Sequence, residues 1–493
     1  MTELPRAAYS AAQSRELDRL AIASGMPGYT LMCRAGAAAW ALLRARWPAA
    51  RRIVVLAGNG NNGGDGYVLA RLAQAEGFQV TLLSVGDHQG LKGEALLAQA
   101  DLVAAAVPLS PWDGQLPEAD VYVDALFGTG LNKPPGGPFA EAIAALNLRG
   151  GPVLALDIPS GLAADSGAEL GQTVQATVTI SFIALKLGLM TGRGPVCCGA
   201  LAFAGLGIPP AVLAGIEPVA SRMQADDLAA ALPPRARDGH KGDYGYTLVI
   251  GGDHGMGGAI SMAAEAAGRA GSGFVAVATR PEHTALITAR HPEIMAHGVE
   301  GAAQLQPLLA RATVIVLGPG LGQGEWGQAL FEAAVASGLP LVVDADGLNL
   351  LARHPARAAN RVLTPHPGEA ARLLGSTTAQ VQSDRPAALR ELVARYGGAV
   401  VLKGAGSLVG DGSSMAVCPY GNPGMGSGGM GDVLSGIIGA LLAQGLSPYQ
   451  AAHTGVLVHA LAGDDAAADG GERGMQATDL LPHVRRRVNP CKR

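Results

Sequence analysis

The chain has 493 residues, of which 48% are hydrophobic and only 15% are charged, and its formal net charge is −4. Its length predicts at least two domains, and a composition this apolar, with 71 glycines, excludes an intrinsically disordered protein. Because the net charge is small and no basic stripe or long block of like charges occurs, we expect no nucleic-acid partner.

Two helices are predicted at the start of the chain, over residues 10–24 and 30–46, where apolar residues recur at helical spacing. Strands and helices then alternate. A helix is expected from about Tyr67, and short apolar strands are predicted at residues 52–57, 80–83, 121–124 and 153–157. This alternation is typical of a parallel sheet covered by helices on both faces, so residues 1–221 are predicted to form a Rossmann-like three-layer α/β domain.

The alternating pattern lapses at residues 205–240, in a passage rich in proline and arginine that is suited to a link between domains. The alternation then restarts with further predicted strands, which begin at Tyr246, Phe274, Thr313, Leu341 and Val400. The final third of the chain is mostly helical in pattern. We therefore expect a second, unrelated α/β domain over residues 222–493.

The N-terminus, the cysteines and the apolar segments predict a cytoplasmic protein. Acidic and polar residues stand at the N-terminus, where a secretory signal would have its apolar core. The most apolar late stretch, residues 433–442, is too short to span a bilayer, so no membrane association is expected. No Cys-x-x-Cys spacing occurs, and reduced thiols are expected at Cys33, Cys197, Cys198, Cys418 and Cys491.

A glycine-rich segment, Gly58-Asn-Gly-Asn-Asn-Gly-Gly-Asp-Gly66, lies between a predicted strand and a predicted helix. Backbone N–H groups at a helix N-terminus, unhindered by side chains, form a cradle for phosphate oxygens. The segment contains Gly-x-Gly-x-x-Gly at Gly58, Gly60 and Gly63, which alone would favour an NAD-dependent dehydrogenase with Asp87 as the ribose-binding acid.

Three polar residues do not fit that plain pattern, because Asn61, Asn62 and Asp65 offer oxygens for a cation or a ligand hydroxyl as well. Two later strands also end in acidic residues, Asp124 and Asp157. In a parallel sheet the ligand lies at the carboxyl ends of the strands, so the three carboxylates are expected to converge. The alternative is that each Asp only caps a helix or turn.

The segments Asn61-Asn-Gly-Gly-Asp-Gly, Asp124-Ala-Leu-Phe-Gly-Thr-Gly and Asp157-Ile-Pro-Ser-Gly together resemble the motifs of NAD(P)H-hydrate epimerases, over residues 10–215. The resemblance implies that Asp157 contacts the altered nicotinamide ring as the acid–base residue. A K⁺ ion is implied near Asn62, Asp124 and Ser160. The hydrated dinucleotide would be held by two segments, Asn61, Asn62, Gly63, Gly64 and Asp65, and Gly128, Thr129, Gly130, Leu131, Asn132, Lys133 and Pro134.

Two further positions bear on this resemblance. Lys186, in Phe182-Ile-Ala-Leu-Lys-Leu-Gly-Leu, matches a lysine of the family, and whether it is catalytic or structural is left open. Cys33 stands where the family usually has Glu, which puts the local helix packing or pairing in doubt but not the site.

A second glycine-rich segment, Gly424 to Gly436, runs directly into an apolar helix. Unhindered N–H groups at the positive end of a helix suit a phosphoryl group that gains charge during transfer. Asp432, at the predicted helix start, is placed to take a proton from a hydroxyl as that hydroxyl attacks phosphorus. The alternative is a flexible linker in which Asp432 is only an N-cap.

Four more loops follow predicted strands of this half. Lys403, at the end of a strand, is a candidate for holding phosphate, and the small residues after it let an adenine or ribose approach the backbone. His366 lies between two prolines and is held rigidly, either for a ligand or as a simple turn residue. The remaining loops, which end at Gly322 and Ala259, are glycine-rich.

Together these segments, with Asn422-Pro-Gly-Met and Gly428-Gly-Met-Gly-Asp-Val-Leu-Ser-Gly, resemble the ADP/ATP-dependent NAD(P)H-hydrate dehydratases of the ribokinase-like fold, over residues 222–490. The resemblance implies contacts to the adenine nucleotide from Lys403, Gly404, Ala405, Gly406, Ser407 and Gly431. It implies contacts to the hydrated dinucleotide from Ala259, Gly322, His366 and Asp432. With both halves in this order, the chain resembles the bacterial bifunctional NAD(P)H-hydrate repair enzymes.

This resemblance implies epimerisation of (R)- and (S)-NAD(P)H-hydrate by the first domain, with K⁺. It also implies dehydration of the (S) form to NAD(P)H by the second domain, with Mg²⁺ and ADP, giving AMP and phosphate. ADP rather than ATP follows from the bacterial members, and a homo-oligomer is expected; a preference for NADH or NADPH is left open. The competing hypotheses are a ribokinase-like small-molecule kinase fused to a dinucleotide-binding domain, an NAD-dependent dehydrogenase, and a catalytically silent binding module.

Overall fold

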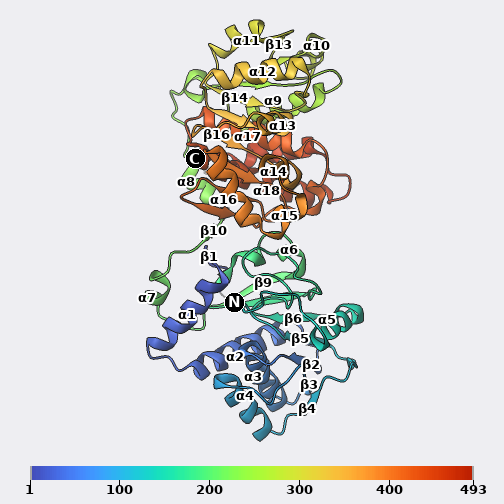
Figure 1. Ribbon diagram of the computed structural model, residues 1–493. Helices are drawn as coiled ribbons and strands as arrows, with labels where there is room; N and C mark the ends of the chain where they lie inside the picture. Colours follow the sequence, from blue (N-terminus) through green and yellow to red (C-terminus); the bar gives the residue numbers. More distant parts are fainter. Residues whose placement is uncertain (1–2, 491–493) are drawn as a thin grey trace. The chain divides into compact units, whose positions relative to one another are not determined.

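The computed structural model describes residues 3–490, and the chain divides into two compact units, Met1–Arg222 and Met223–Arg493 (Figure 1). The first unit contains a parallel sheet whose strands lie in the order β4 (Leu109–Pro111), β3 (Gln79–Ser84), β2 (Arg52–Ala57), β5 (Val121–Ala125), β6 (Val153–Leu156), β7 (Val178–Phe182) and β9 (Ala200–Ala204). The chain winds outward from β2 to β4 and then returns to β5 on the other side of β2. The carboxyl ends of β2 and β5 therefore form the crevice where ligands bind in open parallel sheets.

Helices cover both faces of this sheet (Figure 1). Ile53 and Val55 of β2 face the helices α2 (Gly28–Arg46), α3 (Asn61–Ala75) and α4 (Gly93–Ala104), while Val54 and Leu56 face α5 (Pro138–Arg149). Alternate residues of one strand thus fill two cores, as expected for a buried parallel strand. The prediction of a three-layer α/β arrangement is confirmed.

The helix α3 begins at Asn61, six residues before the predicted start at Tyr67. The prediction was wrong because glycines weaken an isolated helix, whereas here they are required by packing. A Cβ at Gly63 would lie 2.0 Å from the Gly58 carbonyl oxygen, and one at Gly66 would lie 2.7 Å from the Cβ of Ala125. The segment predicted as a loop is therefore the closely packed first turns of a helix.

Three short strands of the first unit join distant parts of the chain. They lie in the order β10 (Ala220–Arg222), β1 (Ala7–Tyr9) and β8 (Leu185–Lys186), with β1 in the middle. The remaining helices of the unit are α1 (Ala11–Ala23), η1 (Leu187–Leu189), α6 (Gly194–Cys197) and α7 (Pro210–Ala214). Leu17 and Ala21 of α1 are fully buried against Ile183 and Ala184, so this helix is fixed in place.

The sheet of the second unit runs in the order β13 (Met295–Gly298), β12 (Phe274–Thr279), β11 (Tyr246–Ile250), β14 (Val314–Leu317), β15 (Leu341–Val343), β16 (Arg361–Leu363), β17 (Ala399–Leu402), β18 (Leu408–Gly410) and β19 (Met415–Val417). The strands from β13 to β17 are parallel, and β18 pairs antiparallel with both β17 and β19. The carboxyl ends of β11, β14, β15, β16 and β17 all open toward the same edge of the sheet.

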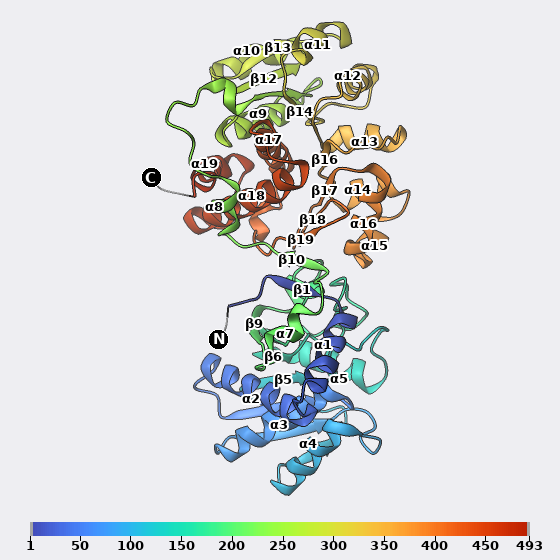
Figure 2. The same ribbon diagram turned by 90° about the vertical axis from the view of Figure 1, so that its left-hand side faces the viewer.

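Helices lie on both faces of this sheet as well (Figure 2). One face carries α9 (Gly257–Arg269), α17 (Met430–Ala443), α18 (Pro448–Gly470) and α19 (Leu481–Arg487), and the other carries α12 (Glu325–Ala336), α13 (Ala345–Arg353), α14 (Pro367–Leu374) and α16 (Arg385–Tyr396). The shorter or peripheral helices are α8 (Asp227–Ala231), η2 (Lys241–Tyr244), α10 (Pro281–Arg290), α11 (Ala302–Leu309), α15 (Thr378–Ser383), η3 (Pro423–Met425) and η4 (Ala477–Leu480). Glycines again allow close packing, because a Cβ at Gly436 of α17 would lie 2.1 Å from the Ala263 carbonyl oxygen.

The passage at residues 205–240, predicted as a link, contains α7, β10 and α8, so it is partly ordered into short elements. Cys33, Cys197, Cys198 and Cys418 are free thiols, and Cys491 lies outside the described residues. Within residues 3–490, the helices are all too short or too polar to cross a membrane.

Candidate functional site

A cavity of about 540 Å³ opens in the first unit at the carboxyl ends of its central strands. Its walls come from the loops after β2, β5 and β6 and from α1 and α2. Most of the residues predicted to hold the dinucleotide line it, namely Asn61, Asn62, Asp65, Gly128, Thr129, Gly130, Leu131, Asn132, Lys133 and Asp157. Gly63, Gly64 and Pro134 are not among its lining residues. Gly63 and Gly64 are instead buried against Gly58 and Met32, where added side chains would clash.

Asp157 is held at the edge of this cavity by a fully buried lysine. The ammonium group of Lys186 forms an ion pair with the Asp157 carboxylate and also donates hydrogen bonds of 3.2 Å to Ser181 Oγ and to the Phe182 carbonyl oxygen. The Phe182 N–H donates to Asp157 Oδ1 at 3.3 Å. Asp157 also adopts φ of +66°, a conformation that is costly for a non-glycine residue and is typical of functional sites.

Asp124 and Ser160 lie beside the cavity as a hydrogen-bonded pair. Ser160 donates from Oγ to Asp124 Oδ1 at 2.7 Å and from its N–H to Asp124 Oδ2 at 2.8 Å. Burial raises the pKa of Asp124 to about 6, although the hydrogen bonds from Ser160 lower it in part. Asn62 is 7% exposed, and neither polar atom of its side-chain amide has a hydrogen-bond partner.

The loop after β5 lies between Asn62 and Asp157. A Cβ at Gly128 would lie 3.5 Å from Asp157 Oδ2 and 3.6 Å from the Asn62 Cβ, so a side chain here would fill the space between them. The structure therefore brings Asn62 and Asp157 to the same loop. Asp65 also lines the cavity, whereas Asp124 lies outside its lining, so the predicted convergence of three strand-end carboxylates holds for Asp65 and Asp157.

The sequence motifs did not identify one further acidic residue, Asp18, which lines the cavity from α1. Burial raises its pKa to about 6, with the Asp157 charge adding to the rise and Lys186 opposing it. Burial likewise holds the pKa of Asp65 well above its usual range. The available signal was helical spacing, because Ser14, Asp18 and Ile22 all face the cavity at intervals of four residues.

In the second unit, Asp432 lies in the first turn of α17, as predicted. Gly429 precedes the helix with φ of +91°, a conformation that favours glycine and leaves the first N–H groups of the helix unobstructed. A Cβ at Gly431 would lie 3.2 Å from Lys403 Nζ and 3.4 Å from Asp344 Oδ2. The helix start thus meets the ends of β15 and β17.

Lys403 is surrounded by carboxylates. Its ammonium group lies 2.8 Å from Asp344 Oδ1 and 3.8 Å from Glu369 Oε2. Burial lowers the pKa of Lys403, but Asp344 and Glu369 outweigh this effect and the pKa is raised. Burial, with the charges of Asp344 and Glu369, raises the pKa of Asp432 to about 7. Neither Asp344 nor Glu369 was singled out in the sequence, because each looks there like an ordinary strand-end or helix-start acid.

The segment from Gly404 to Ser407 forms the tight turn between β17 and β18. Ser407 closes this turn, since its Oγ donates to the Gly404 carbonyl oxygen at 3.0 Å and accepts from the Gly404 N–H at 3.2 Å. Gly406 has φ of +62°, and Ala405 is exposed at the tip. Behind the turn, the guanidinium of the buried Arg385, also missed in the sequence, donates to the carbonyl oxygens of Leu402 and Lys403.

His366 caps α14, and its Nδ1 accepts a hydrogen bond of 3.0 Å from the Gly368 N–H. Burial lowers its pKa, so the neutral ring carries its proton on Nε2. The Nε2 atom lies 3.5 Å from Glu369 Oε1, so a ligand that bound Nε2 would share this donor with Glu369. Gly322 donates its N–H to Asp346 at 3.0 Å, and Ala259 lies in α9 near Gly320.

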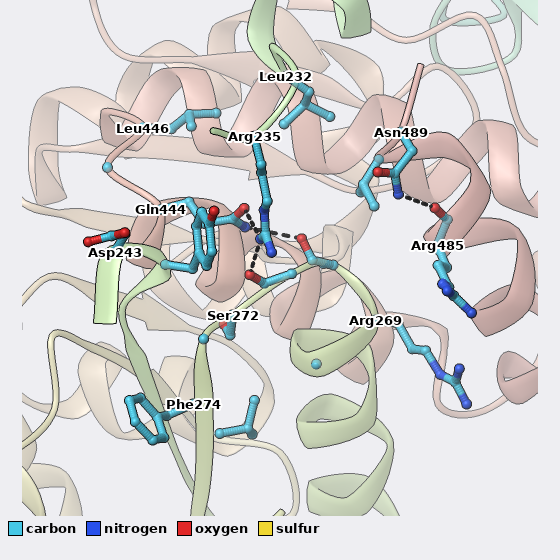
Figure 3. A pocket seen from close by; sticks show the side chains of 18 of the residues that line it. Leu232, Arg235, Asp243, Arg269, Ser272, Phe274, Gln444, Leu446, Arg485 and Asn489 are labelled. Carbon is cyan, nitrogen blue, oxygen red and sulfur yellow. Dashed lines mark hydrogen bonds between the residues drawn. The ribbon is translucent and has the colours of Figure 1, made fainter. Parts of the chain in front are cut away.

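A larger cavity, of about 1650 Å³, lies in the second unit near the N-terminal ends of β11 and β12 (Figure 3). Arg235 crosses it, donating to Gln444 Oε1 at 2.7 Å and lying over the Tyr244 ring at 3.6 Å. This edge of the sheet is opposite to the one that carries Lys403 and Asp344. None of the residues predicted to bind substrate or nucleotide lines this cavity.

Comparison with known proteins finds a separate family match in each half of the chain. Residues 28–188 match the family described as YjeF-related protein N-terminus, and residues 247–486 match NAD(P)H-hydrate dehydratase. A bifunctional NAD(P)H-hydrate repair enzyme of Coxiella burnetii is 50% identical over 98% of this chain and 99% of its own length. That of Escherichia coli is 48% identical over 94% of this chain and 90% of its own length.

A solved structure shows the likeness of the second unit. A ribokinase-like superfamily protein of Enterococcus faecalis matches 54% of this chain and 95% of its own, with a TM-score of 0.51 and 29% identity. The predicted ribokinase-like fold is confirmed by this match. The identities over nearly the full length show that the chain belongs to the family of bifunctional NAD(P)H-hydrate repair enzymes.

Proposed function

We propose that the chain repairs hydrated NADH and NADPH at two separate sites. The first unit interconverts the (R) and (S) hydrates, and the second unit dehydrates the (S) form with ADP, yielding NAD(P)H, AMP and phosphate. The observation that carries the proposal is Asp432, a carboxyl with a pKa of about 7 in the first turn of α17, next to Lys403. That is the arrangement needed to deprotonate a hydroxyl and to stabilise a phosphoryl group together.

The hydrate carries a hydroxyl on C6 of the nicotinamide ring, and hydroxide is a poor leaving group. Asp432 takes the proton of that hydroxyl as its oxygen attacks the terminal phosphorus of ADP. The N–H groups at the start of α17, from Gly429 to Gly431, receive the charge that develops on the phosphoryl oxygens. The lone pair of the ring nitrogen then expels phosphate, and loss of a proton from C5 completes the double bond.

The groups around Asp432 have supporting roles in this scheme. Mg²⁺ prefers phosphate oxygens together with one or two carboxylates, and Asp344 and Glu369, the carboxylates beside Lys403, would be the residues to hold it. When bound, Mg²⁺ would screen the phosphoryl charge. Lys403, fixed by these two residues, contributes positive charge to the nucleotide phosphates, and the turn from Gly404 to Ser407 receives the adenosine.

The residues implied for K⁺ fit that ion in the first unit. Asn62 offers a buried amide oxygen that has no partner, and Asp124 and Ser160 offer a carboxylate and a hydroxyl. Oxygen donors of mixed charge are those that hard cations take. K⁺ would neutralise the buried Asp124 and fix the Gly128 loop against Asn62.

Removal of the Asn62 amide should therefore weaken the response to K⁺. We expect K⁺ to raise the epimerisation rate and the melting temperature of the wild-type chain, and Asn62→Ala to lose at least about tenfold in K⁺ affinity. The exposed neighbour Asn59 supplies a matched control, since Asn59→Ala should keep the K⁺ response. Equal stabilisation by tetramethylammonium chloride would show that the effect is one of ionic strength.

A single assay tests the repair activity. The purified chain is mixed with (R)- and (S)-NADH hydrate, ADP and Mg²⁺, and the absorbance of NADH is followed. We expect complete recovery of NADH from both forms. A small-molecule kinase would instead release a stable phosphorylated product, a dehydrogenase would need oxidised cofactor and a second substrate, and a silent module would give no change. No recovery with either ADP or ATP would overturn the proposal.

A further inference from the structure

Helix α1 forms one wall of the epimerase cavity. Ser14, Asp18 and Ile22 lie on the same side of this helix and line the cavity together. The adjacent side of the helix is buried in the core through Leu17 and Ala21. Asp18 is therefore presented to the cavity by an element that packing holds in place.

Polar contacts at the first turns of α1 fix its orientation further. The Ala11 N–H donates to Asp165 Oδ1 at 2.6 Å, and Arg15 donates to the carbonyl oxygen of Thr129 at 3.3 Å. Thr129 belongs to the loop that lines the cavity beside Asp157. Asp18 thus has a defined position relative to the residues proposed to hold the dinucleotide.

The Asp18 carboxyl forms no contact among the described residues that would stabilise the fold. Among residues 3–490 it makes no hydrogen bond and no ion pair, whereas Asp157 already holds Lys186 and the Phe182 N–H. The other charged groups at the cavity come from six different parts of the fold. They are Arg15 of α1, Asp65 of α3, Glu94 of α4, Lys133 of the loop after β5, Asp157 after β6, and Lys186 of β8, which pairs with Asp157. A half-buried carboxyl in this setting is available to a ligand.

Inversion at C6 needs two proton transfers. The departing hydroxyl must gain a proton to leave as water, and the water that adds to the other face must lose one. Asp157 alone supplies one carboxyl for these two tasks. A second group that exchanges a proton near neutral pH, on another wall of the cavity, completes the requirement.

We propose that Asp18 is the second catalytic residue of the epimerisation, acting as the partner of Asp157; this inference rests on the proposed epimerase function. The C6–O bond breaks as Asp18 gives its proton to the hydroxyl, and the lone pair of N1 forms the N1=C6 bond of an iminium ion. Water then adds to the opposite face, the π electrons return to N1, and Asp157 receives the proton. Turnover in the reverse direction, or exchange with solvent, restores the proton to Asp18.

Asp65 is the other candidate in the cavity, and its surroundings assign it a different role. Its pKa is held well above the usual range by burial and by the charges of Asp157 and Asp18. These surroundings favour the protonated form of Asp65, which is suited to donating a hydrogen bond. Asp18, with a pKa of about 6, both gives and takes a proton in the working range.

The test is Asp18→Asn in the full-length chain, with (R)-NADH hydrate as the probe and epimerisation followed separately from dehydration. We expect the epimerisation kcat to fall by about 10²–10⁴-fold, the usual contribution of a positioned acid or base. Uptake of ¹⁸O at C6 from labelled water should fall in parallel. The dehydratase rate on the (S) form should stay unchanged, and the thermal unfolding curve of the variant should match that of the wild type, which shows that the first unit is folded as well. Glu16→Gln is the matched control, because Glu16 lies on α1, pairs with Arg19 and does not line the cavity.

The pH profile supplies an independent readout. The mechanism starts with a proton on Asp18, so the wild-type rate should fall as the pH rises above about 6. Asp18→Glu, which keeps a carboxyl, should retain measurable activity with a displaced profile. If Asp18→Asn fails to fold, an Asp18→Glu variant with the unchanged wild-type profile overturns the proposal. Epimerisation by Asp18→Asn within threefold of wild type also overturns it, whereas a wild-type chain that does not epimerise overturns the proposed function itself.

Discussion

Asp432→Asn is expected to lower the kcat of the dehydratase by about 10²–10⁴-fold, because the amide cannot accept the proton of the C6 hydroxyl. The substitution is nearly isosteric, and the position lies in the first turn of α17, where Asn is tolerated. Epimerisation should be unaffected. The measurement is the rate of NADH formation from (S)-NADH hydrate with saturating ADP, together with the rate of (R)-to-(S) conversion.

The pH dependence of the wild-type dehydratase provides a second check of this role. A general base works only when it is deprotonated, and the pKa of Asp432 is about 7. The wild-type rate should therefore rise with pH up to about 7 and level off above it. Asp469→Asn, at an exposed position of α18, serves as the control and should reproduce this profile. An Asp432→Asn variant that still dehydrates at a rate near wild type would remove Asp432 from the mechanism.

Asp157→Asn is expected to divide the repair of a mixed hydrate sample into two phases. The (S) fraction should be converted to NADH at the wild-type rate, and the (R) fraction should follow only at the uncatalysed rate. The measurement is the time course of NADH absorbance from a mixture of known (R) and (S) content. Rapid repair of both forms would exclude a catalytic role for Asp157.

This substitution also leaves the buried ammonium group of Lys186 without its counter-charge. Loss of one partner from a buried ion pair costs about 3–5 kcal/mol in the free energy of unfolding. The double variant Asp157→Asn with Lys186→Met removes both charges and should recover much of that stability, but not the epimerisation. Denaturant unfolding of the single and double variants separates the two effects. Asp113→Asn, at an exposed loop position, controls for the loss of one negative charge.

The architecture followed from the sequence because apolar strands and helices alternate regularly in both halves. The positions of β2, β5, β11 and β12 agree with the predicted strands within a few residues. The start of α3 did not follow from the sequence. Glycine and asparagine disfavour an isolated helix, but close packing against Gly58 and Ala125 requires small residues at those positions.

Site residues could be predicted from the sequence where they stand together in a short motif. They could not be predicted where the fold brings them together from separate elements. Asp432 stands inside a contiguous glycine-rich segment. Asp18, Asp344 and Glu369 stand on separate elements, and each becomes distinctive only when the fold brings it next to another charge. Arg385 is similar, since its role depends on a backbone turn that is distant from it in the sequence.

The pairing of β1 with β8 and β10 limits where this protein can be truncated or joined to a tag. Tyr9 of β1 pairs with Lys186 of β8, and the same strand pairs with Ala220 on its other side. A chain trimmed to begin at residue 28, where the match to the family model begins, would lose both β1 and Asp18. A functional epimerase unit must therefore include the residues from β1 onward. An affinity tag should be attached before β1 through a flexible spacer.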